Sequence, residues 1–117
     1  MKPRETERRH TESQQLDVVL CLDPDLLWFR GHFAVQPLLP GVAQIDWVMH
    51  YATTILLPGW RFQQLQNVKF QSPLLPGATV TLTLNWHAER QILSFSYHRH
   101  DGDARHIASS GKIRLCR

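Results

Sequence analysis

The hydrophobic pattern of the chain changes from a short strand-like run to a helix-like stretch, and then to a two-residue alternation. Residues 16–22, LDVVLCL, are mostly Leu and Val, which favours a buried strand. Residues 42–57 are apolar on nearly every face, follow Pro40-Gly41 and end at Pro58-Gly59, so this stretch predicts a buried helix. The first part of the chain therefore predicts one strand followed by one helix.

The second half of the chain alternates with the two-residue period of strands. Residues 79–86 and 93–98 alternate apolar and polar side chains, which is typical of half-buried strands. Residues 67–71 and 107–115 predict two more strands, and Asp101-Gly102-Asp103 predicts a hairpin turn. One buried helix packed against an antiparallel sheet is an α+β arrangement, and this is the fold class that we expect.

The chain has the length of one domain, at 117 residues. Residues 1–14 are polar and charged, which predicts a flexible tail ahead of a single domain over residues 15–117. A domain of this size buries a limited core, so an interface with a second subunit would add useful apolar burial.

Residues 26–41 combine two Pro and two Gly with large apolar side chains. The segment is unsuited to a regular helix or a central strand, yet it is too apolar for an ordinary exposed loop. Inward-packing loops of this kind often carry function. His32 lies within this loop, and a single loop histidine is either a hydrogen-bonded structural residue or a general base.

Three further residues could join His32 in a site. Asp46 and His50 are four residues apart on the predicted helix and share one face. That face either meets solvent or forms a polar line in an apolar pocket, where pKa values are easily shifted. Gly41 lies at the helix start, where free N–H groups favour negative charge. A base, an acid and such an amide suit proton abstraction next to a carbonyl.

The spacing of these residues resembles a known signature, that of bacterial 3-hydroxyacyl-[acyl-carrier-protein] dehydratases. The signature is an aromatic residue, Gly-His-Phe, a proline, Pro-Gly-Val, and a carboxylate fourteen residues after the histidine. It is matched here by Phe29, Gly31-His32-Phe33, Pro37, Pro40-Gly41-Val42 and Asp46. A second block, Val-Lys-Phe followed by a Pro-Gly turn, is matched by Val68-Lys69-Phe70 and Pro76-Gly77.

The resemblance implies a hot-dog fold, in which a curved antiparallel sheet wraps a long helix and two subunits form a continuous sheet. It implies the elimination of water from a 3-hydroxyacyl thioester, giving a trans-2-enoyl thioester in fatty acid or related polyene lipid biosynthesis. His32 would be the base, Asp46 of the partner subunit's helix would assist departure of the hydroxyl, and the Gly41 amide would polarise the thioester carbonyl. No metal or other cofactor is implied.

The chain departs from the family pattern in three places. Ala34 replaces a proline after Gly-His-Phe, and His50 replaces the glutamine that often follows the carboxylate. His50 adds a titratable group beside Asp46, and we expect it to contact the substrate. Asp46 itself is the carboxylate of the branch that can also isomerise the new double bond. The short chain and His50 resemble the dehydratases of aryl polyene clusters.

Charge and composition narrow the range of partners. The net charge of +3 weakly favours an acidic partner, and the resemblance implies an acyl carrier protein or coenzyme A as carrier of the acyl substrate. The sequence has no basic stripe interleaved with aromatic residues, so nucleic-acid binding is not predicted. Neither a signal peptide nor a bilayer-length apolar stretch is evident, which predicts a cytoplasmic protein without membrane insertion. The histidines between residues 98 and 106 favour a solvated hairpin over a metal site.

Two alternative functions stay open. A hot-dog thioesterase shares the fold and can use a helix carboxylate, although it does not need the Gly-His-Phe loop. A non-catalytic partner of another dehydratase is the second alternative, against which the presence of both His32 and Asp46 counts. The expected assembly is a homodimer or a heterodimer with a related hot-dog subunit.

Overall fold

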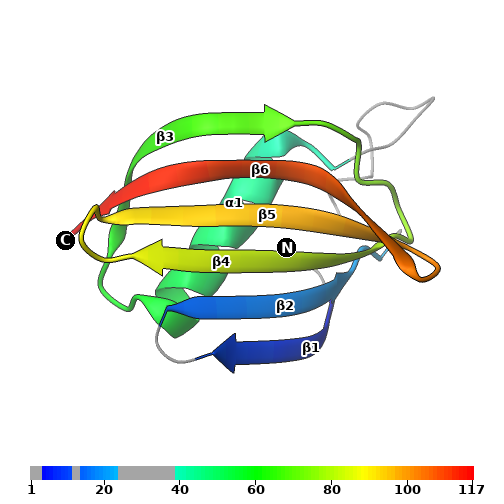
Figure 1. Ribbon diagram of the computed structural model, residues 1–117, viewed down its shortest axis with the longest axis horizontal. Helices are drawn as coiled ribbons and strands as arrows, with labels where there is room; N and C mark the ends of the chain where they lie inside the picture. The colour runs from blue at the N-terminus through cyan, green and yellow to red at the C-terminus, as the bar shows by residue number, and fades with distance from the viewer. Residues whose placement is uncertain (1–3, 12–13, 24–38) are drawn as a thin grey trace.

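The computed structural model describes residues 4–11, 14–23 and 39–117. One helix lies against a six-stranded sheet with the order β1-β2-β4-β5-β6-β3 (Figure 1). The strands are β1 (Arg4–Thr11), β2 (Gln15–Cys21), β3 (Arg61–Phe70), β4 (Thr79–His87), β5 (Ile92–Asp101) and β6 (Ala104–Cys116). The helix α1 (Gly41–Tyr51) continues into a π-helical turn, η2 (Ala52–Leu56). Neighbouring strands pair antiparallel, so the α+β prediction is confirmed.

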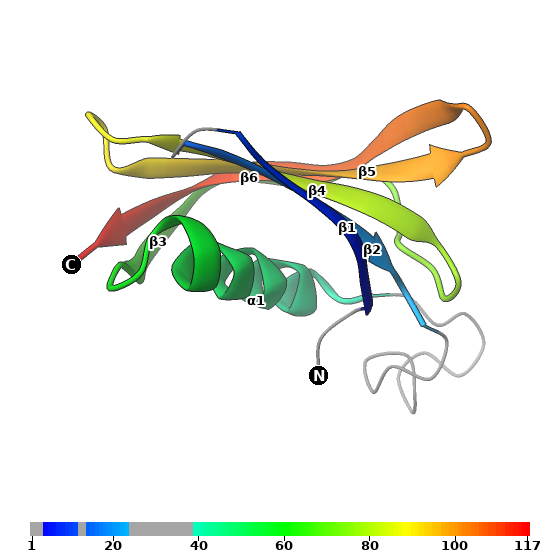
Figure 2. The ribbon, with the colours of Figure 1, turned by 90° about the horizontal axis from the view of Figure 1, so that it is seen from below.

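The sheet curves around α1, which lies on its concave side (Figure 2). The core forms between the two layers, because alternate strand residues point towards the helix. Leu82 and Leu84 of β4 are fully buried, and so are Trp47 and Val48 of α1. A long helix wrapped by a curved antiparallel sheet is the hot-dog arrangement that the family signature implies.

The prediction of a flexible tail over residues 1–14 is wrong for residues 4–11. They form β1, which pairs with β2 from Arg4↔Cys21 to Thr11↔Gln15. Backbone hydrogen bonding along an existing strand orders this segment, so it needs no apolar side chains. The hydrophobic pattern of the sequence therefore does not predict a polar edge strand of this kind.

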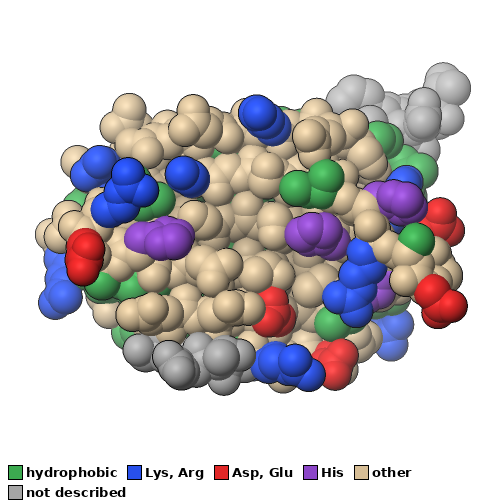
Figure 3. All heavy atoms as spheres, in the orientation of Figure 1, with side chains coloured by type: hydrophobic (Ala, Val, Ile, Leu, Met, Phe, Trp, Pro, Cys, Tyr) green, Lys and Arg blue, Asp and Glu red, His purple; other side chains and the backbone are tan. Residues whose placement is uncertain are grey.

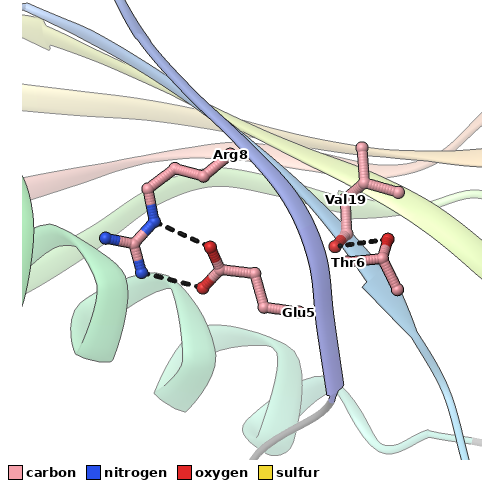
Figure 4. A network of polar contacts seen from close by, with 4 residues as sticks. All are labelled: Glu5, Thr6, Arg8 and Val19. Carbon is pink, nitrogen blue, oxygen red and sulfur yellow. Dashed lines mark hydrogen bonds and ion pairs between the residues drawn. The ribbon is translucent and has the colours of Figure 1, made fainter.

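A bulge gives β1 its one ion pair among the residues that the structure describes. The register with β2 shifts between Glu5 and Glu7, which brings the side chains of Glu5 and Arg8 together. Arg8 donates two hydrogen bonds to the Glu5 carboxylate, at 2.7 and 2.8 Å (Figure 4). Thr6 donates to the Val19 carbonyl of β2 at 3.3 Å.

The two edges of the sheet differ in chemistry. β1 carries charged side chains, which discourage the addition of another strand. β3 instead exposes three large apolar side chains, with exposed fractions of 45% for Phe62, 43% for Leu65 and 54% for Phe70. β3 begins at Arg61 rather than at residue 67, because an edge strand with most side chains exposed lacks the alternation that marks half-buried strands.

The helix also differs from the prediction for residues 42–57. Regular α-helical bonding ends at Tyr51, and the N–H group of Leu57 donates to the Ala52 carbonyl at 2.7 Å, an i→i+5 bond. The Thr53 hydroxyl donates to the Met49 carbonyl at 2.7 Å and competes for the acceptors of the last turn. Among the described residues, no helix has the length and hydropathy needed to cross a bilayer.

Candidate active site

The first turn of α1 has backbone N–H groups that its own helix does not use. Pro40 precedes the helix in an extended conformation, and its carbonyl accepts from the N–H groups of Ala43 at 3.1 Å and Gln44 at 3.2 Å. Among the described residues no side chain caps this turn, and no acidic residue lies in it. Within the described part of the chain the N–H groups of Gly41 and Val42 have no acceptor, and with the positive end of the helix dipole they suit the binding of an anion.

Glycine is required at position 41 because the Phe70 ring approaches it closely, and not because of its backbone angles. A Cβ atom placed on Gly41 would lie 2.7 Å from the Cζ atom of Phe70, well inside van der Waals contact. Phe70 is the last residue of β3, and its half-exposed ring covers the start of the helix. Phe70, from the second block of the family signature, therefore lies against Gly41 of the Pro40-Gly41 pair.

We expect Gly41→Ala to lower turnover roughly tenfold while the protein remains folded. The added methyl group must push aside the Phe70 ring, which can move because it is partly exposed, and the methyl then occupies space beside the amide. Steady-state kinetics and a thermal melt measure the two effects. Adding Phe70→Ala should recover part of the loss, whereas wild-type turnover by Gly41→Ala would contradict this role of Gly41.

Asp46 and His50 lie on the face of α1 that turns away from the core. Asp46 is exposed and His50 is half-buried, whereas Trp47 and Val48 between them pack against the sheet. The helix is therefore buried on one face only, unlike the all-round burial that its composition predicts. Val42, with an exposed fraction of 67%, extends the open face to the first turn. The polar stripe thus meets the outside of the single chain, one of the two readings left open by the sequence.

Gly41 and Asp46 belong to the same helix, Gly41 as its first residue. They are five residues apart, or about 7.5 Å along the helix axis. That separation leaves room for a thioester carbonyl at the amide and a 3-hydroxyl group at the carboxylate, each within hydrogen-bond distance of about 2.9 Å. His32 lies in the segment 24–38, outside the described residues, so its pairing with Asp46 stays a prediction.

The outer face of the sheet has no comparable arrangement. Side chains of both charges and histidines are scattered over it (Figure 3). His100 is hydrogen-bonded to the Thr81 hydroxyl at 2.7 Å, and partial burial, with lesser effects of Arg105 and His98, lowers the pKa of its ring. In the described part of the chain, no three potential metal ligands lie close enough to hold an ion.

Comparison with known proteins adds independent findings. The family model described as ApeI dehydratase matches residues 7–112. A chain of the dehydratase heterocomplex ApeI:P from Xenorhabdus doucetiae is 54% identical with a TM-score of 0.93, and the alignment covers 100% of both chains. An uncharacterized protein from Erwinia carotovora subsp. atroseptica is 55% identical with a TM-score of 0.92, covering 99% of this chain and 97% of that one.

More distant proteins share the fold or part of the sequence. The dehydratase domain of PpsC from Mycobacterium tuberculosis has a TM-score of 0.76 at 17% identity, covering 100% of this chain and 45% of that one, which shows the fold alone. The 3-hydroxyacyl-[acyl-carrier-protein] dehydratase FabZ of Shewanella sp. is 26% identical over 92% of this chain and 77% of its own length. FabZ of Tolumonas auensis is 32% identical over 55% of this chain, which spans about half (48%) of that relative.

These comparisons confirm that the chain has a hot-dog fold and that its motifs resemble those of dehydratases.

Proposed function

Because the chain belongs to the ApeI dehydratase family, we propose that it eliminates water from a 3-hydroxyacyl thioester to give a trans-2-enoyl thioester. The observation that carries this proposal is the start of α1. There the uncapped Gly41 amide and the Asp46 carboxylate are held on one rigid helix, at a separation that fits the two reacting ends of such a substrate.

The proposed reaction needs only proton movement and charge stabilisation. His32 removes a proton from C2, and the electrons of that C–H bond form the C2=C3 double bond. Negative charge that develops on the thioester oxygen is bound by the Gly41 amide. The Asp46 carboxyl group, in its protonated form, gives a proton to the 3-hydroxyl group as the C3–O bond breaks, and water leaves. The proton taken up by His32 then restores the Asp46 carboxyl group before the next turnover. His50, half-buried on the same face as Asp46, contacts the bound substrate.

We propose that the active assembly is a pair of hot-dog subunits, either two copies of this chain or this chain with a related one. The exposed Phe62 and Leu65 on β3 support an added strand at this edge, because a partner would cover them and satisfy the edge backbone. The exposure of Asp46 in the single chain supports a site completed by a second subunit. A 54% identical chain belongs to a structure described as a dehydratase heterocomplex.

The test is a panel of 3-hydroxyacyl thioesters on acyl carrier protein and on coenzyme A, followed by intact mass spectrometry. The expected product has lost one water and keeps its carrier. A 3-deoxyacyl thioester is the matched control, because it has no hydroxyl group to lose. Release of free acid would favour the thioesterase alternative. Turnover only after addition of a related hot-dog subunit would show that the active assembly is the heterodimer.

Mixed dimers test whether the site is shared. If His32 comes from one subunit and Asp46 from the other, co-expressed His32→Ala and Asp46→Ala chains should recover about one quarter of wild-type turnover. Random pairing makes half of the dimers mixed, and each mixed dimer has one intact site. The variants expressed alone are the controls. Mixed dimers that are seen by native mass spectrometry but are inactive would contradict a site shared between two copies.

His50→Gln should leave the enzyme active but alter its pH profile. Glutamine keeps hydrogen-bonding capacity and does not titrate, so any inflection of the pH profile that comes from His50 should disappear. The pH dependence of kcat measures this effect. Complete loss of turnover would instead make His50 a catalytic residue.

A further inference from the structure

Gln44 is a polar residue on the buried face of α1, with an exposed fraction of 3%. The Oε1 atom of its side chain accepts a hydrogen bond from the Ser109 hydroxyl at 2.6 Å. Its Nε2 atom donates to the Leu39 carbonyl at 3.3 Å, and its backbone carbonyl accepts from the Tyr97 hydroxyl at 2.6 Å. Both ends of the amide and the backbone of this one residue are thus engaged.

The two groups that hold Gln44 come from paired positions in the sheet. Tyr97 of β5 and Ser109 of β6 are register partners, and both are fully buried. Burial raises the pKa of the Tyr97 phenol well above its usual value, and Tyr51 and the negative charge of Asp46 raise it further. The phenol is therefore a hydrogen-bond donor at neutral pH, as its bond to the Gln44 carbonyl requires.

Leu39 connects this network to the start of the helix. Its carbonyl accepts from Gln44, and its N–H group donates to the Leu74 carbonyl, in the connection between β3 and β4, at 2.8 Å. The next residue, Pro40, receives the first N–H groups of the helix, and Gly41 follows. The position of the Gly41 amide is therefore set from the sheet through Gln44 and Leu39.

An apolar residue at position 44 would fill the same core without burying an amide. A buried amide is costly unless its polar atoms are bonded, and a fully bonded one permits a single arrangement of its partners. Apolar packing alone tolerates small shifts and rotations of a helix. Placing here an amide whose oxygen and nitrogen each have a hydrogen-bond partner therefore favours a fixed position for the first turn over alternatives with a similar apolar core.

We propose that Gln44, held by Ser109 and Tyr97, is a positioning residue that aligns the Gly41 amide with the developing oxyanion. This inference rests on the proposed dehydratase function. Gln44 touches no reacting atom in this role. It acts through the backbone of Leu39 and Pro40, so its loss should affect the transition state more than substrate binding.

Two variants separate positioning from stability. Gln44→Leu leaves the Ser109 hydroxyl buried without its partner, whereas Gln44→Leu with Ser109→Ala replaces both groups by apolar ones, which costs far less stability. We expect both variants to lower kcat roughly tenfold to a hundredfold with little change in KM. The melting temperature should fall for the single variant and recover in the double variant. Thr83→Val is the control, because it removes a 2.7 Å hydrogen bond to Asp17 elsewhere in the sheet.

Amide hydrogen exchange gives a readout that does not depend on turnover. Exchange at Leu39, Ala43 and Gln44, whose N–H groups are hydrogen-bonded, should be faster in both Gln44 variants than in wild type and in Thr83→Val. A double variant with wild-type kcat, or with unchanged exchange, would overturn the inference. If the single variant does not fold, Tyr97→Phe, which removes one bond to Gln44, takes its place with the same expectations.

Lack of turnover by the wild-type assembly would overturn the proposed function, and with it the alignment of an oxyanion. The exchange measurement would then still decide whether Gln44 fixes the helix start.

Discussion

Replacing His32 by alanine is expected to lower dehydration by roughly 10² to 10⁴-fold, the range that a general base contributes. The imidazole is the proposed acceptor of the C2 proton, and neither the Gly41 amide nor Asp46 can substitute for it. The protein should remain folded, because the substitution removes one side chain without placing a new polar group in the core. Turnover is measured by product mass, and folding by circular dichroism.

His87→Ala is the matched control for this substitution. His87 is exposed at the end of β4, where it shares a hydrogen bond of 3.0 Å with Ser94. A histidine that acts as a base must be neutral, so wild-type turnover should fall on acidification, and this acid limb should be lost with His32. Turnover of His32→Ala within a few-fold of wild type would remove His32 from the mechanism.

Replacing Asp46 by asparagine is expected to reduce turnover by a similar factor, roughly 10² to 10⁴-fold. Asparagine keeps the size of the side chain but cannot give a proton to the departing hydroxyl group. The melting temperature should change little, because Asp46 is exposed on α1 while its neighbour Trp47 provides the buried contacts.

Asp103→Asn, in the exposed turn between β5 and β6, makes the same chemical change away from the helix and should leave both quantities unchanged. The reverse result for Asp46→Asn, a lower melting temperature with full turnover, would identify Asp46 as a structural charge.

The sequence by itself determined the dehydratase family and most of the sheet. The alternation of apolar and polar residues identified β4 and β5. Each of these strands has one face on the core, so neighbouring residues along it differ in burial. The spacing from His32 to Asp46 singled out the candidate pair for the same reason, since a motif within one segment needs no knowledge of distant residues.

Only the tertiary structure decided which surfaces meet. Strand β1 is ordered by backbone pairing with β2, and β3 is longer than its pattern indicates, because edge strands need little apolar burial. Gly41 meets Phe70 because β3 ends beside the start of α1. Gln44 bonds to residues 53 and 65 positions away, and the register of β5 with β6 places both of them against the helix. Such contacts depend on register and layer packing, which no local pattern of side chains encodes.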